Sequence, residues 1–187
     1  MSTPDETPLA DHAAIAAAVD RAVSDQPVTD MHTHCYAPAF GASPDPDGLL
    51  LWGIDELVTY HYLVAEVFRV VPPWELAYED FWAMDKSARA DHIWQHLFVE
   101  RTPISEAGRG VVTTLTKLGL DPNETSLEPY RQWSKEQDPG VHVDRVMELA
   151  GVDQIVMTNE VFTDAERERW LADDSIADDP RFAPVLR

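Results

Sequence analysis

The stretch Pro27-Val28-Thr29-Asp30-Met31-His32-Thr33-His34 decides how the rest of the chain is interpreted. Its residue types predict a short strand over 28–31 that leads into two histidines. Side chains two positions apart on a strand point the same way, so His32 and His34 are expected to converge where the strand ends. Two imidazoles on one face make half of a divalent-metal site. The pattern therefore predicts that His32 and His34 bind a metal, and the alternative is a surface pair without one.

Cys35 follows His34 directly, and on a strand it would point to the opposite face. We therefore expect Cys35 to pack rather than to bind metal. As the single cysteine it excludes an internal disulfide framework and favours a reducing cytoplasm. Residues 1–8 are polar and acidic and lack the basic and apolar regions of a secretory signal, which agrees with a cytoplasmic location.

The composition excludes several classes of partner. The chain has 187 residues, 44% of them hydrophobic, which is enough to build a core. It contains no run of 18 apolar residues, so we expect no membrane span. The net charge of −20 argues against nucleic acid and against an anionic membrane surface, because both require clustered lysine and arginine.

Hydrophobic periodicity and helix-ending residues divide the chain into helices and strands. Helices are predicted over 9–24, 54–70, 74–84, 87–99, 105–118, 127–136, 141–150 and 163–172. Gly119 and Gly151 are expected to end two of them. Strands are predicted over 28–31, 154–158 and 181–187. Single strands that alternate with helices indicate an α/β fold with a parallel sheet, in which about a hundred mainly helical residues follow the first strand.

Other polar residues are weaker candidates for a site. His61 and Tyr62 lie inside an apolar stretch, and composition alone favours a buried pair satisfied by its neighbours. Arg69, Arg101 and Arg109 stand alone and are interpreted as surface residues.

A second histidine pair has metal-like spacing. His92 and His96 are four residues apart on a predicted helix, but the segment lacks the glutamate of an HExxH motif. His12 and His142 have no supporting neighbours. The sequence contains neither a glycine-rich phosphate loop nor a GxSxG motif.

Residues 30–34 resemble the strand-1 metal motif of the amidohydrolase superfamily, and within it the chain most resembles the uronate (glucuronate) isomerases. Further landmarks follow in the order typical of that family. They are Tyr60-His61-Tyr62-Leu63, residues 94–101, residues 147–159 and the final stretch 182–187. One residue and one three-residue stretch depart from the family pattern. Thr33 replaces a common cysteine, and Asn159-Glu160-Val161 stands where Asp-Asp-Pro is usual, so the choice of substrate is left open.

The resemblance implies a fold and an activity. The fold is the N-terminal portion of a (β/α)₈ metal-dependent hydrolase-like barrel, with residues 1–187 as an incomplete TIM-barrel domain and 49–140 as a large helical insertion after strand 1. The activity is aldose–ketose isomerisation of a hexuronate, either D-glucuronate to D-fructuronate or D-galacturonate to D-tagaturonate. A proton moves from C2 to C1 without net redox change.

The resemblance also implies roles for five residues. His32 and His34 would bind a divalent metal ion, usually zinc. His61 and Tyr62 would act in catalysis and substrate binding through hydrogen bonds or a proton relay. Arg187 would bind the substrate carboxylate. The partner is then a small sugar acid, and a homo-oligomer is left open.

In such enzymes a third histidine, an aspartate and the acidic base come from later strands. We therefore expect the 187-residue chain alone to be inactive. Two alternatives remain open from the sequence. One is hydrolysis or decarboxylation by another member of the superfamily, and the other is a non-catalytic acidic helical interaction module.

Overall fold

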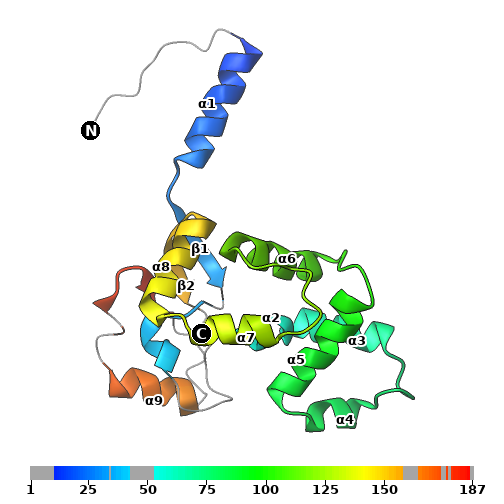
Figure 1. Cartoon of the computed structure of the whole chain (residues 1–187). Helices are drawn as coiled ribbons and strands as arrows, with labels where there is room; N and C mark the ends of the chain where they lie inside the picture. Colours follow the sequence, from blue (N-terminus) through cyan, green and yellow to red (C-terminus); the bar gives the residue numbers. More distant parts are fainter. Residues whose placement is uncertain are drawn as a thin grey trace.

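The computed structural model describes residues 11–33, 35–42, 53–157, 164–173, 176 and 178–185. The first elements are α1 (His12–Ser24), β1 (Val28–Thr33), η1 (Pro38–Ala42), α2 (Ile54–Val58), α3 (His61–Val70), α4 (Tyr78–Ala83) and α5 (Lys86–Trp94). They are followed by η2 (Gln95–Val99), α6 (Glu106–Leu118), α7 (Glu128–Lys135), α8 (Pro139–Ala150), β2 (Val152–Met157), α9 (Asp164–Ala172) and β3 (Phe182–Ala183). Figure 1 shows their arrangement.

The three strands form one parallel sheet in the order β1-β2-β3. Ile155 and Met157 of β2 are buried against residues of η1 and α8, a group that we call the sheet core. The sheet core comprises Tyr36, Ala37, Phe40, Val143, Met147, Ile155, Met157, Ile176 and Phe182. The prediction of an α/β fold with a parallel sheet is therefore confirmed.

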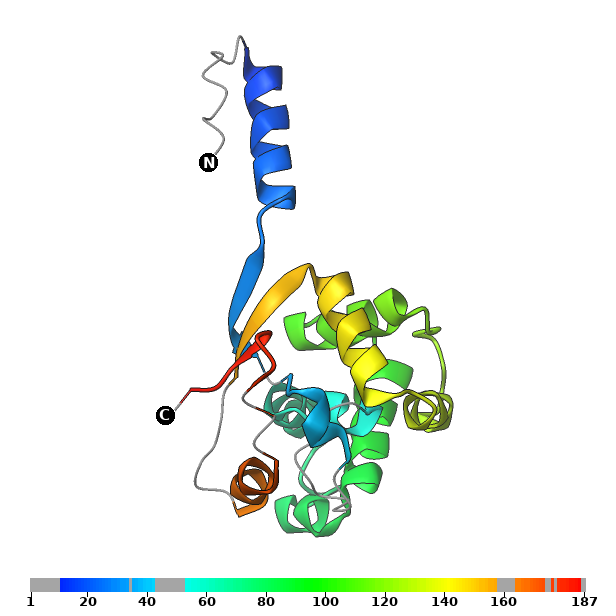
Figure 2. The ribbon, with the colours of Figure 1, turned by 90° about the vertical axis from the view of Figure 1, so that its left-hand side faces the viewer.

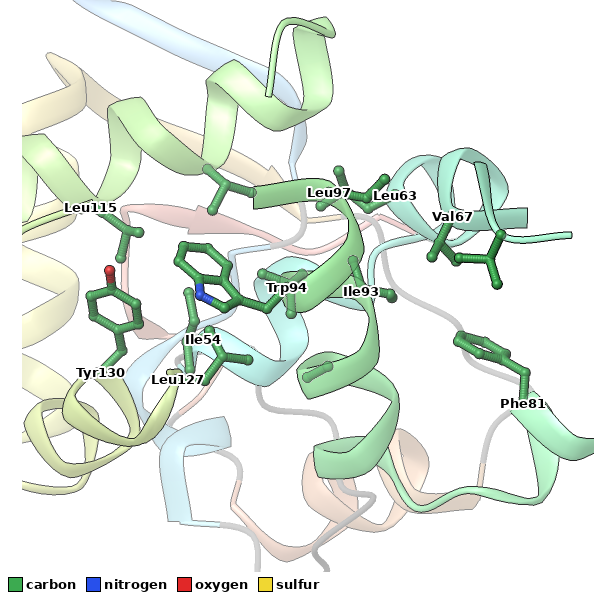
Figure 3. Packing of buried hydrophobic residues seen from close by; sticks show 14 residues of the cluster. Ile54, Leu63, Val67, Phe81, Ile93, Trp94, Leu97, Leu115, Leu127 and Tyr130 are labelled. Carbon is green, nitrogen blue, oxygen red and sulfur yellow. The ribbon is translucent and has the colours of Figure 1, made fainter. Parts of the chain in front are cut away.

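The helices between β1 and β2 enclose a second group of buried residues, which we call the helical core. It comprises Ile54, Val58, Leu63, Val67, Val71, Phe81, Ala90, Ile93, Trp94, Leu97, Val111, Leu115, Leu127 and Tyr130. Trp94 lies at its centre (Figure 3). Its ring stacks on Phe98 at 4.4 Å between ring centroids, and its Nε1 donates a hydrogen bond of 3.0 Å to the carbonyl of Glu124.

Helix ends follow the capping residues of the sequence. Ser105 accepts a hydrogen bond from the backbone N–H of Gly108 at the start of α6, and Asp138 accepts one from Val141 in α8. Gly119 and Gly151 close the same two helices with φ of 82° and 66°, the left-handed conformation that glycine adopts without strain. The two predicted glycine ends are confirmed.

The predicted helix over 54–70 is wrong, because it is broken into α2 and α3. The hydroxyl of Thr59 donates a hydrogen bond of 2.6 Å to the carbonyl of Asp55, and Tyr60 then adopts an extended conformation. The same type of bond occurs at Thr114 and Thr116 within the unbroken α6, so the break is marked by the extended backbone of Tyr60 and not by this hydroxyl. The apolar periodicity runs across the break, so the pattern alone could not locate it.

Other boundaries also differ from the prediction. The helix expected over 74–84 begins only at Tyr78, because residues 73–75 form a turn. The helix expected over 87–99 changes to a π-helical turn at Gln95, and strand β2 begins earlier than expected, at Val152.

Helix α1 stands apart from the rest of the molecule. Figures 1 and 2 show it projecting beyond the sheet, and it contains no buried residue. Its apolar side chains Ile15, Val19 and Val23 are 47%, 53% and 70% exposed. Within the described residues, no helix has both the length and the apolar character needed to cross a membrane.

Candidate functional site

The parallel sheet brings the carboxyl ends of its strands to one edge. Thr33 at the end of β1 lies opposite Met157 at the end of β2, and Ile155 pairs with Phe182 of β3. In parallel α/β proteins, ligands bind at the carboxyl edge of the sheet. The predicted ligand His32 lies at this edge, which makes it the candidate site.

A β-bulge lies next to His32. Asp30 pairs with Ile155, and Thr33 pairs with Met157. The segment of β1 between these pairs is therefore one residue longer than the segment of β2 that it faces. Within the bulge, the backbone N–H of His32 donates a hydrogen bond of 3.0 Å to Oδ1 of Asp30. Bulges next to active sites redirect side chains. Strict alternation, from which we predicted that His32 and His34 converge, is therefore interrupted within β1.

His32 itself is exposed. His34, the second predicted ligand, lies outside the described residues, and so does Arg187. Their joint placement with His32 stays a prediction.

Cys35 packs against the sheet core. Burial, assisted by the nearby charge of Asp30, raises the pKa of its thiol to about 11. Because the thiolate is the form that binds metals, burial favours the inert protonated thiol. The prediction that Cys35 packs is confirmed.

The prediction that His61 and Tyr62 form a buried pair is wrong. Both residues are exposed, and Tyr62 is 61% accessible. They occupy the first turn of α3, whose buried face begins only at Leu63. Their rings lie 4.2 Å apart between centroids, and the ring of Tyr60 lies at the same distance from His61. Exposure leaves these polar groups accessible to a ligand.

Two clefts meet at Tyr62. The first has a volume of about 470 Å³ and is also lined by Thr33 and Cys35. The second, of about 720 Å³, lies between α3 and α6 and is lined by Tyr62 together with Glu66 and Arg69. Tyr62 and the end of β1 therefore border one cleft although they are far apart in the sequence. His61 does not line either cleft.

Sequence reasoning missed the contact that holds α3 in place. Oγ of Ser105 donates a hydrogen bond of 2.7 Å to Oε2 of Glu66 and at the same time caps α6. The partner of Ser105 lies 39 residues away in the sequence, so no local pattern indicates the contact. Arg69, which we interpreted as a surface residue, is exposed and lines the second cleft.

The other histidine pair lies on α5 and η2. The rings of His92 and His96 lie 4.4 Å apart between centroids, and Nδ1 of His96 lies 2.8 Å from Oε2 of Glu100. Burial, with the charge of His96, lowers the pKa of His92. Among the described residues, no three His, Cys, Asp or Glu side chains are placed to hold a metal ion.

Comparison with known proteins gives one informative match. No family model and no curated protein matches the chain. A solved structure, a uronate isomerase from Bacillus halodurans C-125, is 46% identical in sequence and superposes with a TM-score of 0.77. The match covers 96% of this chain and 40% of the solved chain.

An identity of 46% along nearly the whole chain, with the same fold, confirms the relationship that the histidine strand and the His-Tyr pair indicated. The chain spans about 40% of the length of the solved enzyme. It therefore belongs to the uronate isomerase family and corresponds to a part of such a protein.

Proposed function

We propose that the chain forms part of an aldose–ketose isomerase that converts D-glucuronate to D-fructuronate or D-galacturonate to D-tagaturonate. The observation that carries the proposal is the 46% identity to a uronate isomerase over 96% of this chain. The proposed fold of the longer protein is a (β/α)₈ barrel, to which β1, β2 and β3 contribute consecutive parallel strands and into which residues 49–140 are inserted.

The proposed metal ligands of this chain are His32 and His34. The exposed imidazole of His32 at the carboxyl edge of the sheet is chemically suited to a divalent ion such as zinc. Because the chain spans about 40% of the length of the solved enzyme, the remaining ligands would come from other parts of the longer protein. The bound ion would supply Lewis acidity and a fixed point for the oxygens of the sugar acid.

The proposed roles of the other residues follow from their chemistry. Tyr62 borders the cleft at the end of β1, and its hydroxyl would donate to, or accept from, a sugar oxygen. His61, exposed beside it, would hold or pass a proton during the transfer from C2 to C1. Arg187 would bind the carboxylate, because a guanidinium offers two parallel N–H donors.

A chimera tests this proposal. The 187 residues would be joined to the part of the Bacillus halodurans enzyme that they do not match, with that whole enzyme as the positive control. Incubation with D-glucuronate or D-galacturonate in D₂O should yield the ketose, detected by NMR, with no release of carbon dioxide.

The chimera's fold would first be checked by circular dichroism and a cooperative unfolding transition. A folded chimera that forms no ketose from either uronate contradicts the proposal. Release of carbon dioxide would indicate a decarboxylase instead.

A further inference from the structure

The bulge in β1 determines on which face of the sheet His32 lies. In a regular strand Asp30 and His32 would share one face, because side chains alternate with a period of two. The bulge adds one residue between Asp30 and Thr33, so Thr33 takes the place that alternation would give to His32. Accordingly, Asp30 and Thr33 are both half-buried, whereas Met31 and His32 between them are exposed.

The face that Thr33 takes is the one turned toward the rest of the chain. Thr33 lines the first cleft together with Cys35, which packs against the sheet core. Oγ1 of Thr33 accepts a hydrogen bond of 3.3 Å from the backbone N–H of Cys35, so these two residues are also joined directly. His32 lines neither of the two clefts. The bulge therefore leaves His32 on the other, exposed side of β1, where an ion can reach its imidazole.

One hydrogen bond closes this bulge from within the strand. Oδ1 of Asp30 accepts it from the backbone N–H of His32 at 3.0 Å. Aspartate and asparagine make this contact with the backbone two residues further on, because their side chains have the right length for it. A bulge interrupts the ladder of backbone hydrogen bonds between neighbouring strands, and a side-chain acceptor compensates for part of that loss.

We propose that Asp30 is a positioning residue for the metal ligand His32. Its hydrogen bond to the N–H of His32 holds the bulge that keeps this imidazole on the exposed side of β1. Without that bond the strand can return to regular alternation, and a shift of one residue would turn His32 to the opposite face. The inference rests on the proposed function, because it takes His32 as a metal ligand, and it adds a residue that acts on this ligand through the backbone.

Zinc binding by the full 187-residue chain tests the inference. Zn²⁺ is added as the chloride, and its affinity is measured from the NMR signals of the His32 imidazole. Asp30→Asn keeps an oxygen acceptor at the same distance from the backbone but removes the charge, so its zinc affinity should stay close to that of wild type. Asp30→Glu keeps the charge but lengthens the side chain by one methylene. Its affinity should fall by about tenfold or more, as is usual when a residue that supports a metal ligand is changed.

Asp153→Asn is the matched control. It removes the same charge from an exposed position near the amino end of β2, and it should leave zinc affinity unchanged. Circular dichroism and the unfolding midpoint would show that all variants remain folded. In the metal-free chain, the His32 amide should exchange with deuterium faster in Asp30→Glu than in wild type or Asp30→Asn, whereas the amides of β2 should exchange at an unchanged rate.

Equal zinc affinities of wild type and Asp30→Glu would overturn the inference. An equal loss in Asp30→Asn and Asp30→Glu would also overturn it, because Asp30 would then act through its charge. Wild type in which zinc leaves the His32 signals unchanged would have the same consequence. The chimera tests the isomerase proposal separately. If a chimera with Asp30→Glu forms ketose at the rate of the unsubstituted chimera, the proposed function stands and only the positioning role is overturned.

Discussion

Nε of Arg131 in α7 donates a hydrogen bond of 2.9 Å to Oδ1 of Asp55 in α2, 76 residues earlier in the chain. The same guanidinium donates to Oδ1 of Asp91 and to the carbonyl of Ser87, both in α5, at 2.7 and 3.1 Å. One side chain therefore ties together three helices that surround the helical core.

Replacing this arginine should destabilise the fold. The side chains of Arg131 and Asp55 are only 15% and 20% exposed, so Arg131→Met leaves a carboxylate partly buried without its partner. We expect a loss of about 2 kcal/mol in the free energy of unfolding, between the values for exposed and for fully buried pairs. Urea unfolding of wild type and Arg131→Met would measure this loss.

Arg145→Met is the matched control for that prediction. Arg145 pairs with Glu148, and these side chains are 54% and 73% exposed. Its replacement should change stability by no more than about 0.5 kcal/mol. Equal effects at both arginines would contradict the role of the Arg131 network.

An added methyl group should change the stability of the fold in opposite directions at two glycines. Gly119 has φ of 82°, so Gly119→Ala should cost about 1 kcal/mol in stability from backbone strain. Gly110→Ala lies inside a helix and should raise stability by up to about 1 kcal/mol. No crowding is seen for either change, because beyond the chain neighbours and the helix's own backbone an added Cβ meets no heavy atom of the described residues within 4 Å. Thermal unfolding of both variants would measure the two changes in stability. A more stable Gly119→Ala variant would refute the argument.

Acid should destabilise the chain through His142. Burial lowers the pKa of this imidazole below its ordinary value of 6.5, so the unfolded chain takes up the proton at a higher pH than the folded chain does. The stability that depends on neutral His142 is therefore fully present above about pH 6.5, and it is lost as the pH falls below that value. His92 acts in the same direction, because burial lowers its pKa as well.

The variant His142→Gln should lose less stability than wild type between about pH 7 and about pH 5, because glutamine does not titrate. His12→Gln, at an exposed position in α1, is the control and should retain the wild-type pH dependence. Urea midpoints at the two pH values provide the measurement. If His142→Gln loses as much stability as wild type between the two pH values, His142 does not cause the loss of stability in acid.

The exposed aromatic residues of α3 should matter for activity but not for folding. Tyr62→Phe and His61→Asn in the folded chimera should lower kcat for isomerisation by roughly 10²- to 10⁴-fold, the usual contribution of general acid–base groups. Both residues are exposed, so the unfolding midpoint should stay close to that of the unsubstituted chimera. Full activity in both variants would remove them from the proposed machinery. The isolated 187-residue chain should show no isomerisation.

Local signals in the sequence predicted the local structure well. Gly119 and Gly151 end their helices, and the β-branched run after Gly151 forms the strand β2. The break between α2 and α3 was missed because the apolar periodicity continues across it. The bulge beside His32 was missed because it depends on the register with β2, a strand more than a hundred residues later.

The candidate site could be predicted only in part for the same reason. The residue types at positions 32, 61 and 62 suggested ligands, but their exposure depends on where each element packs. Tyr62 is exposed because α3 starts one residue before it and turns Leu63 toward the core. The clefts arise between α3, α6 and α7, whose relative placement no short stretch of sequence encodes.

The isolation of α1 has a consequence for local dynamics. A helix of 13 residues is only marginally stable in water unless it packs against something, and no residue of α1 is buried. Its backbone amides should therefore exchange with deuterium through fraying of the helix itself, without any opening of the two cores. Protection in α1 then measures a local helix–coil equilibrium, whereas protection in β2 measures the opening of the sheet core. Anything that packs against α1 would become visible as slowed exchange in this one segment.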